Sequence, residues 1–134
     1  MWPFREKPQS TFGDRGEDAA VRYLKKRKYR IVARQFRNTI GEIDIIARQG
    51  KTIVFVEVKT RRSDSAGQPS EAVTPTKQRQ ITRVALSWLK DNDWLNRPAR
   101  FDIIGIIWAD DDKSPEIRHF ENAFEPVGSG QFFS

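Results

Sequence analysis

The sequence contains no cysteine and only one histidine, His119. Without cysteine the chain has no disulfide framework, no thiolate metal site and no cysteine nucleophile. A single histidine also excludes a multi-histidine zinc site within one chain. We interpret His119, close to the end of the chain, as a structural residue rather than a general base. Any metal site must then use oxygen ligands, which suit Mg²⁺ or Mn²⁺.

Long apolar runs are also absent. No run approaches the roughly 20 residues that span a bilayer, and the opening MWPFREKPQS lacks the apolar core of a secretory signal. These absences predict a cytoplasmic protein that does not enter membranes. With 134 residues the chain is long enough for one domain with its own core. We expect a flexible tail over 1–13, a single domain over 14–125 and a second tail over 126–134.

Acidic residues are missing between Ala19 and Gly41, although the chain as a whole carries a net charge of +6. Basic residues fill the same stretch: Arg22, Lys25, Lys26, Arg27, Lys28, Arg30, Arg34 and Arg37. This balance favours a polyanionic partner. Aromatic side chains between the basic ones, Tyr23 and Tyr29 among them, favour nucleic acid. A solubilising surface and an anionic membrane surface remain alternatives.

The first half of the domain predicts one helix and three strands. Apolar residues at helical spacing indicate a helix over 14–27 with Asp14 as its N-cap. Three mixtures of β-branched, aromatic and alternating residues indicate strands over 29–37, 41–47 and 52–60. The short connection over 48–51 contains a glycine, and it predicts a hairpin between the last two strands.

The second half returns to helix and strand. The polar segment 61–73 predicts a mobile loop. Thr74 then caps a second helix, and Pro75 stands at its first position. A strand follows over 100–108, and a last short strand or edge segment ends the domain. The order is αβββαβ, which is typical of an α/β fold with a mixed central sheet flanked by helices. Asp102, late in the sheet, is interpreted as structural.

Two charged residues, Glu57 and Lys59, follow Phe55 on one face of the strand 52–60, because side chains alternate along a strand. Val54 and Val56 point to the opposite face. Both faces are apolar in the first half of the strand, as expected for a central strand. The carboxylate of Glu57 therefore enters at the end of a buried face, where it is costly without a partner.

The hairpin brings Asp44 to the same face. A loop of two or four residues, with paired numbers summing to 99, places Glu42 opposite Glu57 and Asp44 diagonal to Glu57. A three-residue loop would turn Asp44 toward the valines. We prefer the first register because it keeps Ile43 and Ile45 with the valines.

Two or three carboxylates thus lie close together on one face, and only one lysine is near to compensate their charge. A bound Mg²⁺ or Mn²⁺ removes this repulsion. The alternative is a simple ion pair between Glu57 and Lys59 at a strand end, with Asp44 exposed. Glu17 falls near the buried stripe of the first helix. Its spacing from Asp14 also fits a capping box, so both interpretations of Glu17 stand.

An acid on the first helix, an Asp on one strand and E-x-K on the next resemble the PD-(D/E)xK nuclease superfamily, and most closely its Holliday-junction-resolvase-like branch. More narrowly, the chain is identified as a member of the YraN family of uncharacterised, endonuclease-like proteins. The resemblance runs from about Gly16 to Phe124. Six stretches carry it in order: "GEDAAVRYL", "RNTIGEIDIIA", "FVEVKTR", "AVTPTKQRQI", "RFDIIGI" and "HFENAF".

The resemblance implies a role for each residue of the site. Asp44 and Glu57 match the acids that bind Mg²⁺, for which Mn²⁺ substitutes, and Val58 would add its backbone carbonyl. Lys59 matches the catalytic lysine. Glu17 matches the helix acid, which could serve a second metal. Here an isoleucine, not a proline, precedes Asp44.

The activity that the resemblance implies is metal-dependent hydrolysis of DNA phosphodiester bonds, on branched DNA. Cutting a junction would ask for a two-fold homodimer. The alternative is a non-catalytic nucleic-acid-binding or adaptor protein that retains the nuclease fold. Our candidates for contact with the nucleic acid are Arg34, Arg37, Arg61, Arg62, Lys77 and Gln78. The last two could equally be ordinary exposed residues of a first helical turn.

Overall fold

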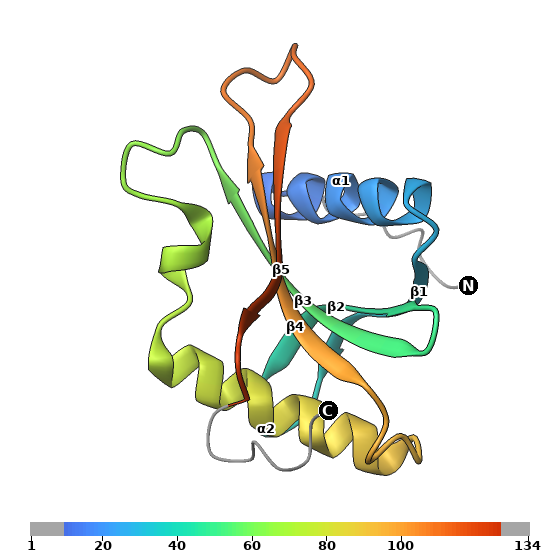
Figure 1. The fold of residues 1–134 in the computed structure, drawn as a ribbon. Helices are drawn as coiled ribbons and strands as arrows, with labels where there is room; N and C mark the ends of the chain where they lie inside the picture. Colours follow the sequence, from blue (N-terminus) through green and yellow to red (C-terminus); the bar gives the residue numbers. More distant parts are fainter. Residues whose placement is uncertain (1–9, 127–134) are drawn as a thin grey trace, which may run out of the picture.

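A five-stranded sheet lies between two α-helices in the computed structural model, which describes residues 10–126 (Figure 1). The elements follow in the order α1 (Phe12–Lys26), β1 (Arg30–Arg37), β2 (Glu42–Gln49), β3 (Thr52–Arg61), the 3₁₀-helix η1 (Pro69–Ala72), α2 (Pro75–Asp91), β4 (Ala99–Ile107) and β5 (Glu116–Phe124). The predicted tails fall mostly on 1–9 and 127–134, outside the described residues.

The strands lie side by side in the order β1-β2-β3-β4-β5. Only β3 and β4 run parallel, and the other neighbours are antiparallel. The mixed α/β sheet predicted from the sequence is therefore confirmed. The last strand, β5, is a full edge strand rather than a short segment. Within the described part of the chain, no helix has the length and apolar character of a membrane span.

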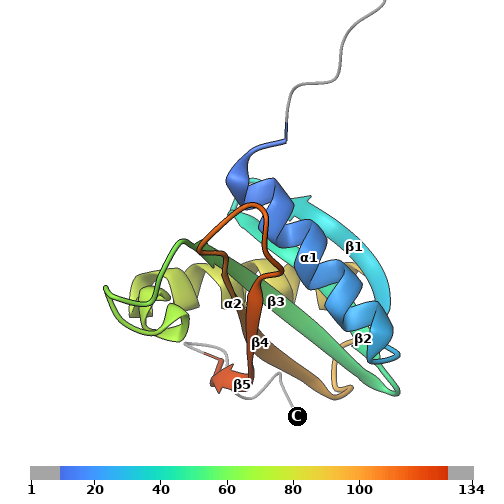
Figure 2. The ribbon, with the colours of Figure 1, turned by 90° about the horizontal axis from the view of Figure 1, so that it is seen from above.

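The strand β3 occupies the centre of the sheet and is buried on both faces. Val54 and Val56 pack with residues of α1, such as Leu24, in one apolar cluster. Phe55 packs with Leu89 of α2 in the other cluster. Figures 1 and 2 show the two helices on opposite faces of the sheet. The alternation predicted along β3 therefore decides which helix each side chain meets.

The first helix begins two residues before the predicted start. Thr11 is the N-cap, its side chain accepts from the Asp14 amide at 3.0 Å, and the Asp14 carboxylate accepts from the Thr11 amide at 3.1 Å. Asp14 is thus the third residue of a capping box rather than the cap itself. The capping interpretation of Glu17 is therefore wrong, and its carboxylate is free for other contacts.

The hairpin between β2 and β3 turns on two residues, Gly50 and Lys51, so that Gln49 pairs with Thr52 and Ile45 with Val56. Gly50 has φ +58°, a left-handed conformation that glycine adopts without strain. The paired numbers sum to 101 rather than the predicted 99, so that register was wrong by two residues. An even shift leaves the paired residues 45–49 of β2 on their predicted faces.

The ladder between β2 and β3 ends at the Ile45–Val56 pair, and β2 is irregular beyond that point. Ile43 and Ile45 consequently enter different apolar clusters, Ile43 on the α2 side and Ile45 on the α1 side. The expectation that both lie with the valines was wrong for Ile43. The backbone amide of Val58 donates to the carboxylate of Asp44 instead of to a partner strand.

The second helix starts as predicted. Thr74 is its N-cap and accepts from the Lys77 amide at 3.2 Å, with Pro75 at the first position. The segment 61–73, predicted as a mobile loop, begins with the last residue of β3 and contains η1, which packs against β3 and β4.

Candidate active site

Asp44, Glu57 and Lys59 come together at the point where β2 and β3 stop pairing. Oδ2 of Asp44 accepts a hydrogen bond from the Val58 amide at 2.8 Å. Nζ of Lys59 lies 3.7 Å from Oε1 of Glu57. The carboxyl groups of Asp44 and Glu57 are close enough that each affects the pKa of the other. The three residues predicted from spacing and parity therefore share one place in the fold.

Burial and mutual repulsion disfavour ionisation of both carboxyl groups. Glu57 is 8% exposed. Burial, followed by the charge of Asp44, raises the pKa of Glu57 to about 7, although Lys77 and Lys59 act in the opposite direction. Burial also raises the pKa of Asp44 above its ordinary value, and the Val58 amide partly counters this. Such a pair is stabilised by a cation.

The donor set of this pair fits a hard divalent cation. Asp44 and Glu57 offer only oxygen atoms, and one lysine does not balance two carboxylates. Mg²⁺ keeps several of its waters and is often held by one or two carboxylates. Among residues 10–126, no three His, Cys, Asp or Glu side chains are placed to hold a metal together. The protein ligands would therefore be these two carboxylates and the predicted backbone carbonyl of Val58.

Glu17 reaches the site from α1 and is engaged by an arginine. Glu17 as a residue is 6% exposed, and its carboxylate accepts from Arg34 Nε at 3.1 Å and Nη2 at 2.7 Å. Arg34 also donates to Asp18 at 2.7 Å. Burial raises the pKa of Glu17, Arg34 lowers it, and the charge of Asp44 raises it again. Glu17 is thus close enough to respond to Asp44, but Arg34 already neutralises it.

A glycine allows α1 to bring Glu17 so close to the sheet. Gly16 packs against Thr60 of β3, and a Cβ atom at Gly16 would lie 1.9 Å from Oγ1 of Thr60. Any other residue would have to push the helix away from the strand. The position before Glu17 therefore controls how near that carboxylate lies to the site.

A hollow of about 260 Å³ opens at the site. The charged side chains in its lining are Asp14, Glu17, Glu42, Asp44 and Lys59. Glu17 and Glu42 pair with Arg34 and Arg37, which leaves the carboxylates of Asp14 and Asp44 in the lining against the one lysine, Lys59. The charge of the hollow is thus the opposite of the charge of the chain as a whole, which is +6.

Gln35 is a residue of this hollow that sequence reasoning missed. It lines the hollow, and a hydrogen bond from its side chain helps to lower the pKa of Glu17. Its φ is +49°, a left-handed conformation that is uncommon outside glycine. Nothing in the strand pattern around Gln35 signals this backbone conformation, and the register shift of β1 against β2 lies elsewhere, between Ile31 and Ala33.

Three of the six predicted nucleic-acid contacts have acidic partners within the protein. Arg34 pairs with Glu17 and Asp18, Arg37 pairs with Glu42, and Arg62 pairs with Asp111. In these pairs the guanidinium charge is already compensated. The other three predicted contacts lie near β3 or the start of α2: Arg61, Lys77 and Gln78. Gln78 donates to the Val73 carbonyl at 3.0 Å, and Lys77 acts on Glu57.

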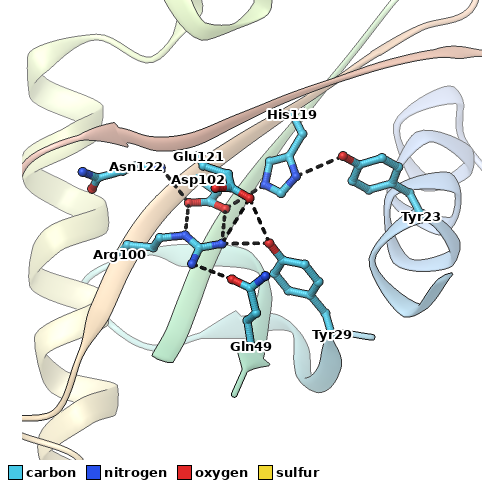
Figure 3. A network of polar contacts seen from close by, with 8 residues as sticks. All are labelled: Tyr23, Tyr29, Gln49, Arg100, Asp102, His119, Glu121 and Asn122. Atoms are coloured by element: carbon cyan, nitrogen blue, oxygen red, sulfur yellow. Dashed lines mark hydrogen bonds and ion pairs between the residues drawn. The ribbon is translucent and has the colours of Figure 1, made fainter. Parts of the chain in front are cut away.

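A second cluster of polar groups surrounds Asp102, which is 1% exposed (Figure 3). Its carboxylate accepts from Arg100 Nε at 3.0 Å and from the Asn122 amide at 2.9 Å, and it lies 2.7 Å from Nε2 of His119. Nδ1 of His119 lies 3.1 Å from the Tyr23 hydroxyl. The cluster thus joins β4 and β5 to α1. Asp102 stands on the α1 face of β4, whereas Glu57 follows Phe55 on the α2 face of β3.

The chain matches a known protein family over the segment that contains the candidate active site. The sequence model of the uncharacterised protein family UPF0102 matches residues 16–106. This segment contains Glu17, Asp44, Glu57 and Lys59.

Similar proteins carry the same family name. A UPF0102 protein of Geotalea uraniireducens is 56% identical over 115 residues, which cover 86% of this chain and 90% of that protein. A UPF0102 protein of Geobacter sulfurreducens is 55% identical over 113 residues, covering 84% of this chain and 88% of that protein. One from Geobacter metallireducens is 52% identical over 115 residues, covering 86% and 93%. These names state no activity.

Proposed function

Because the chain belongs to UPF0102, the uncharacterised YraN family, we propose its function from its own site: it is a metal-dependent nuclease that hydrolyses phosphodiester bonds of DNA. One observation carries this proposal. Two buried carboxyl groups with raised pKa values, Asp44 and Glu57, adjoin one lysine, Lys59, and Asp44 and Lys59 line an acidic hollow. Perturbed carboxyl groups that converge in a hollow are typical of functional sites.

The residues divide the chemistry between them. Asp44 and Glu57 would hold Mg²⁺, or Mn²⁺ in its place, together with the carbonyl of Val58. When bound, such a cation stabilises charge on the phosphate oxygens and acidifies the attacking water. We assign Lys59 to orienting that water or to neutralising the charge that develops on the phosphate. Glu17 would support a second cation only if Arg34 released it.

The substrate that we propose is branched or otherwise structured DNA in the cytoplasm. A homodimer with two-fold symmetry would present two such sites to the arms of a junction. Single-stranded, duplex, flap and four-way DNA of one sequence, each incubated with Mg²⁺ or Mn²⁺, distinguish these substrates. We expect cleavage of at least one of them, and faster cleavage of the branched forms.

Substitutions at the site test the assignment directly. Glu57→Ala, Asp44→Ala and Lys59→Ala should each reduce cleavage by at least a factor of about 100, the usual range for a positioned catalytic group. Asp112→Asn is the matched control, because it neutralises an exposed acid in the connection between β4 and β5. If no DNA structure is cut with either metal, or if the three variants cut as wild type does, the proposal is wrong.

A second candidate function is a DNA-binding adaptor that retains the fold without cleavage. The observation in its favour is that the described residues offer no third acidic ligand and that Arg34 occupies Glu17. Calorimetric titration with Mn²⁺ separates the two functions. A nuclease binds the metal through Asp44 and Glu57, whereas an adaptor binds DNA equally well with Glu57→Ala and needs no metal.

A further inference from the structure

A basic hollow of about 320 Å³ lies around Trp94, at the end of the sheet where β3 and β4 begin. Arg48, Lys51 and Arg97 line it together with Trp94 and Pro98. Three separate segments supply these residues: the end of β2, the β2–β3 turn and the connection between α2 and β4. Among residues 10–126, no acidic side chain lines the hollow.

The cations of this hollow gather around the indole ring. The guanidinium carbon of Arg97 lies 4.4 Å from the centroid of the Trp94 ring, and that of Arg48 lies 5.0 Å from it. Cation–π attraction of this kind holds the two like charges near each other. Nε of Arg48 also donates to the Gly50 carbonyl at 2.7 Å, which fixes Arg48 beside the turn that carries Lys51.

The connection that carries Trp94 is held in a defined conformation. The Trp94 amide donates to the Leu89 carbonyl at 2.8 Å, and Asp93 and Asn96 on either side have φ of +56° and +68°. Within residues 10–126, the indole Nε1 of Trp94 is the one buried side-chain nitrogen or oxygen without a hydrogen-bond partner. An unpaired buried donor costs free energy that an acceptor would recover.

The arginines of this hollow differ from most others in the protein. Six other arginines have carboxylate partners: Arg15, Arg34, Arg37, Arg62, Arg100 and Arg118. Within the part of the chain that the structure describes, neither Arg48, Lys51 nor Arg97 forms an ion pair with a carboxylate. Three cations that converge without a counter-charge are suited to an anion with several acceptor oxygens.

We propose that the hollow around Trp94 binds the phosphate backbone of nucleic acid, as an anchor separate from the acidic site. The choice of DNA as the ligand rests on the proposed nuclease function. At about 3.3 Å per residue, the strand places Lys51 roughly 20 Å from Glu57. A duplex or junction arm that runs along the direction of β3 is long enough to span this distance.

Another basic hollow on α1 is a weaker candidate for this role. Arg22, Lys26 and Arg27 line it. All three cations come from the end of one helix, where positive charge already complements the helix dipole. The Trp94 hollow instead requires three chain segments to converge. The α1 hollow therefore provides a matched control, in which an equal number of charges is removed elsewhere.

Binding without cleavage tests the anchor. Fluorescence anisotropy measures the affinity for labelled duplex and four-way DNA, in EDTA and over a series of salt concentrations. The proteins compared are wild type, Arg48→Ala/Arg97→Ala and Lys51→Glu. We expect the double variant to bind roughly tenfold more weakly and its salt slope to fall by about 1.8, at about 0.9 per phosphate contact. Lys51→Glu, at an exposed turn, should weaken binding without lowering the melting temperature. The control Arg22→Ala/Lys26→Ala should change the slope by less than one contact.

Four outcomes would overturn the anchor. The first two are that wild type does not bind DNA, or that the hollow variants and the control variant lose the same DNA affinity. The third is that inorganic phosphate at the same ionic strength displaces DNA from wild type and from the hollow variants equally well. The fourth is that the hollow residues are needed for binding to phosphatidylglycerol vesicles and not for binding to DNA. Cleavage assays with Mg²⁺ keep the two proposals apart. Wild type that cuts while the hollow variants bind normally refutes only the anchor. Hollow-dependent binding by a protein that does not cut refutes only the nuclease.

Discussion

At the candidate site, burial and a neighbouring acid both act on the carboxyl group of Glu57. Its carboxyl group lies at the end of a buried strand face and beside a second acid, and its pKa rises from 4.5 to about 7 for these reasons. The folded protein therefore binds this proton more tightly than the unfolded chain does. The favourable contribution is complete below about pH 4.5 and is lost as the pH rises to about 7.

We expect Glu57→Gln to be more stable than wild type above pH 7 when no divalent metal is present. A pKa change from 4.5 to about 7 corresponds to roughly 3 kcal/mol, which sets the upper end of the gain in the free energy of unfolding. Urea unfolding in EDTA between pH 4 and 8 measures it. The wild-type curve should fall with pH over this window, and the variant curve should be flatter.

Glu71→Gln is the control for this measurement, since Glu71 is exposed in η1 and its substitution should leave the pH dependence unchanged. Adding Mg²⁺ or Mn²⁺ should restore the stability of wild type at high pH without affecting Glu57→Gln. A wild-type curve that is flat between pH 5 and 7 would show that Glu57 is not buried against Asp44.

At the scale of elements, the order of helices and strands followed from periodicity, but the exact contacts between them did not. The hairpin predicted that Asp44 and Glu57 lie close together, and each carboxyl group does affect the pKa of the other, although Asp44 lies beyond the last pair of β2 with β3. The capping box was predicted three residues too late, because Thr11 and Asp14 have the same spacing as Asp14 and Glu17. Ile43 could not be assigned from alternation, since β2 leaves the regular ladder at Asp44.

The contact between α1 and β3 is the element-level feature that positions Glu17. Gly16→Ala should lower the free energy of unfolding by about 1–3 kcal/mol, because the new methyl group overlaps Thr60. Gly13→Ala in the same helix is the matched control. Its Cβ would lie 3.8 Å from Oγ1 of Thr11, so it should stabilise the helix by about 0.5–1 kcal/mol.

Thermal or urea unfolding of the two alanine variants measures this difference in sign. A helix that shifts also carries Glu17 away from Asp44, so Gly16→Ala should alter cleavage per folded molecule, whereas Gly13→Ala should not. Equal stability of both variants would mean that α1 tolerates side chains at its contact with β3 and does not set the position of Glu17.

At the scale of the whole molecule, charge is separated rather than mixed. The acidic hollow at Asp44 lies within a chain of net charge +6, and the hollow around Trp94 contains only basic charged groups. In the proposed nuclease, this separation would attract a polyanion broadly while the site at Asp44 would depend on a bound cation. Composition predicted a polyanionic partner, but the pairing of Arg34, Arg37 and Arg62 with acids required the three-dimensional structure.

The Asp102 cluster joins segments from both ends of the described chain. Its residues have a structural role, in contrast to the catalytic role that we propose for Asp44 and Glu57. Burial alone would raise the pKa of Asp102, but hydrogen bonds from His119, Arg100 and the Asn122 amide outweigh it and hold the pKa below its ordinary value of 3.8. The stability that this carboxylate contributes is present above pH 3.8 and is lost as the pH falls through the lowered pKa.

Asp102→Asn should therefore lower the free energy of unfolding at pH 7 by about 3 kcal/mol, because it leaves the half-buried guanidinium of Arg100 with only the more distant and exposed carboxylate of Glu121 as a counter-charge. Urea unfolding at pH 7 and at pH 3 measures the loss, which should shrink at the lower pH. Asp111→Asn removes an exposed acid that also pairs with arginines, and it should change stability little.

Mn²⁺ binding per folded molecule should be the same in Asp102→Asn as in wild type, because Asp102 and Glu57 stand on opposite faces of the sheet. If that binding were lost while the protein remained folded, the Asp102 cluster would belong to the metal site, and the interpretation of His119 as structural would fall with it.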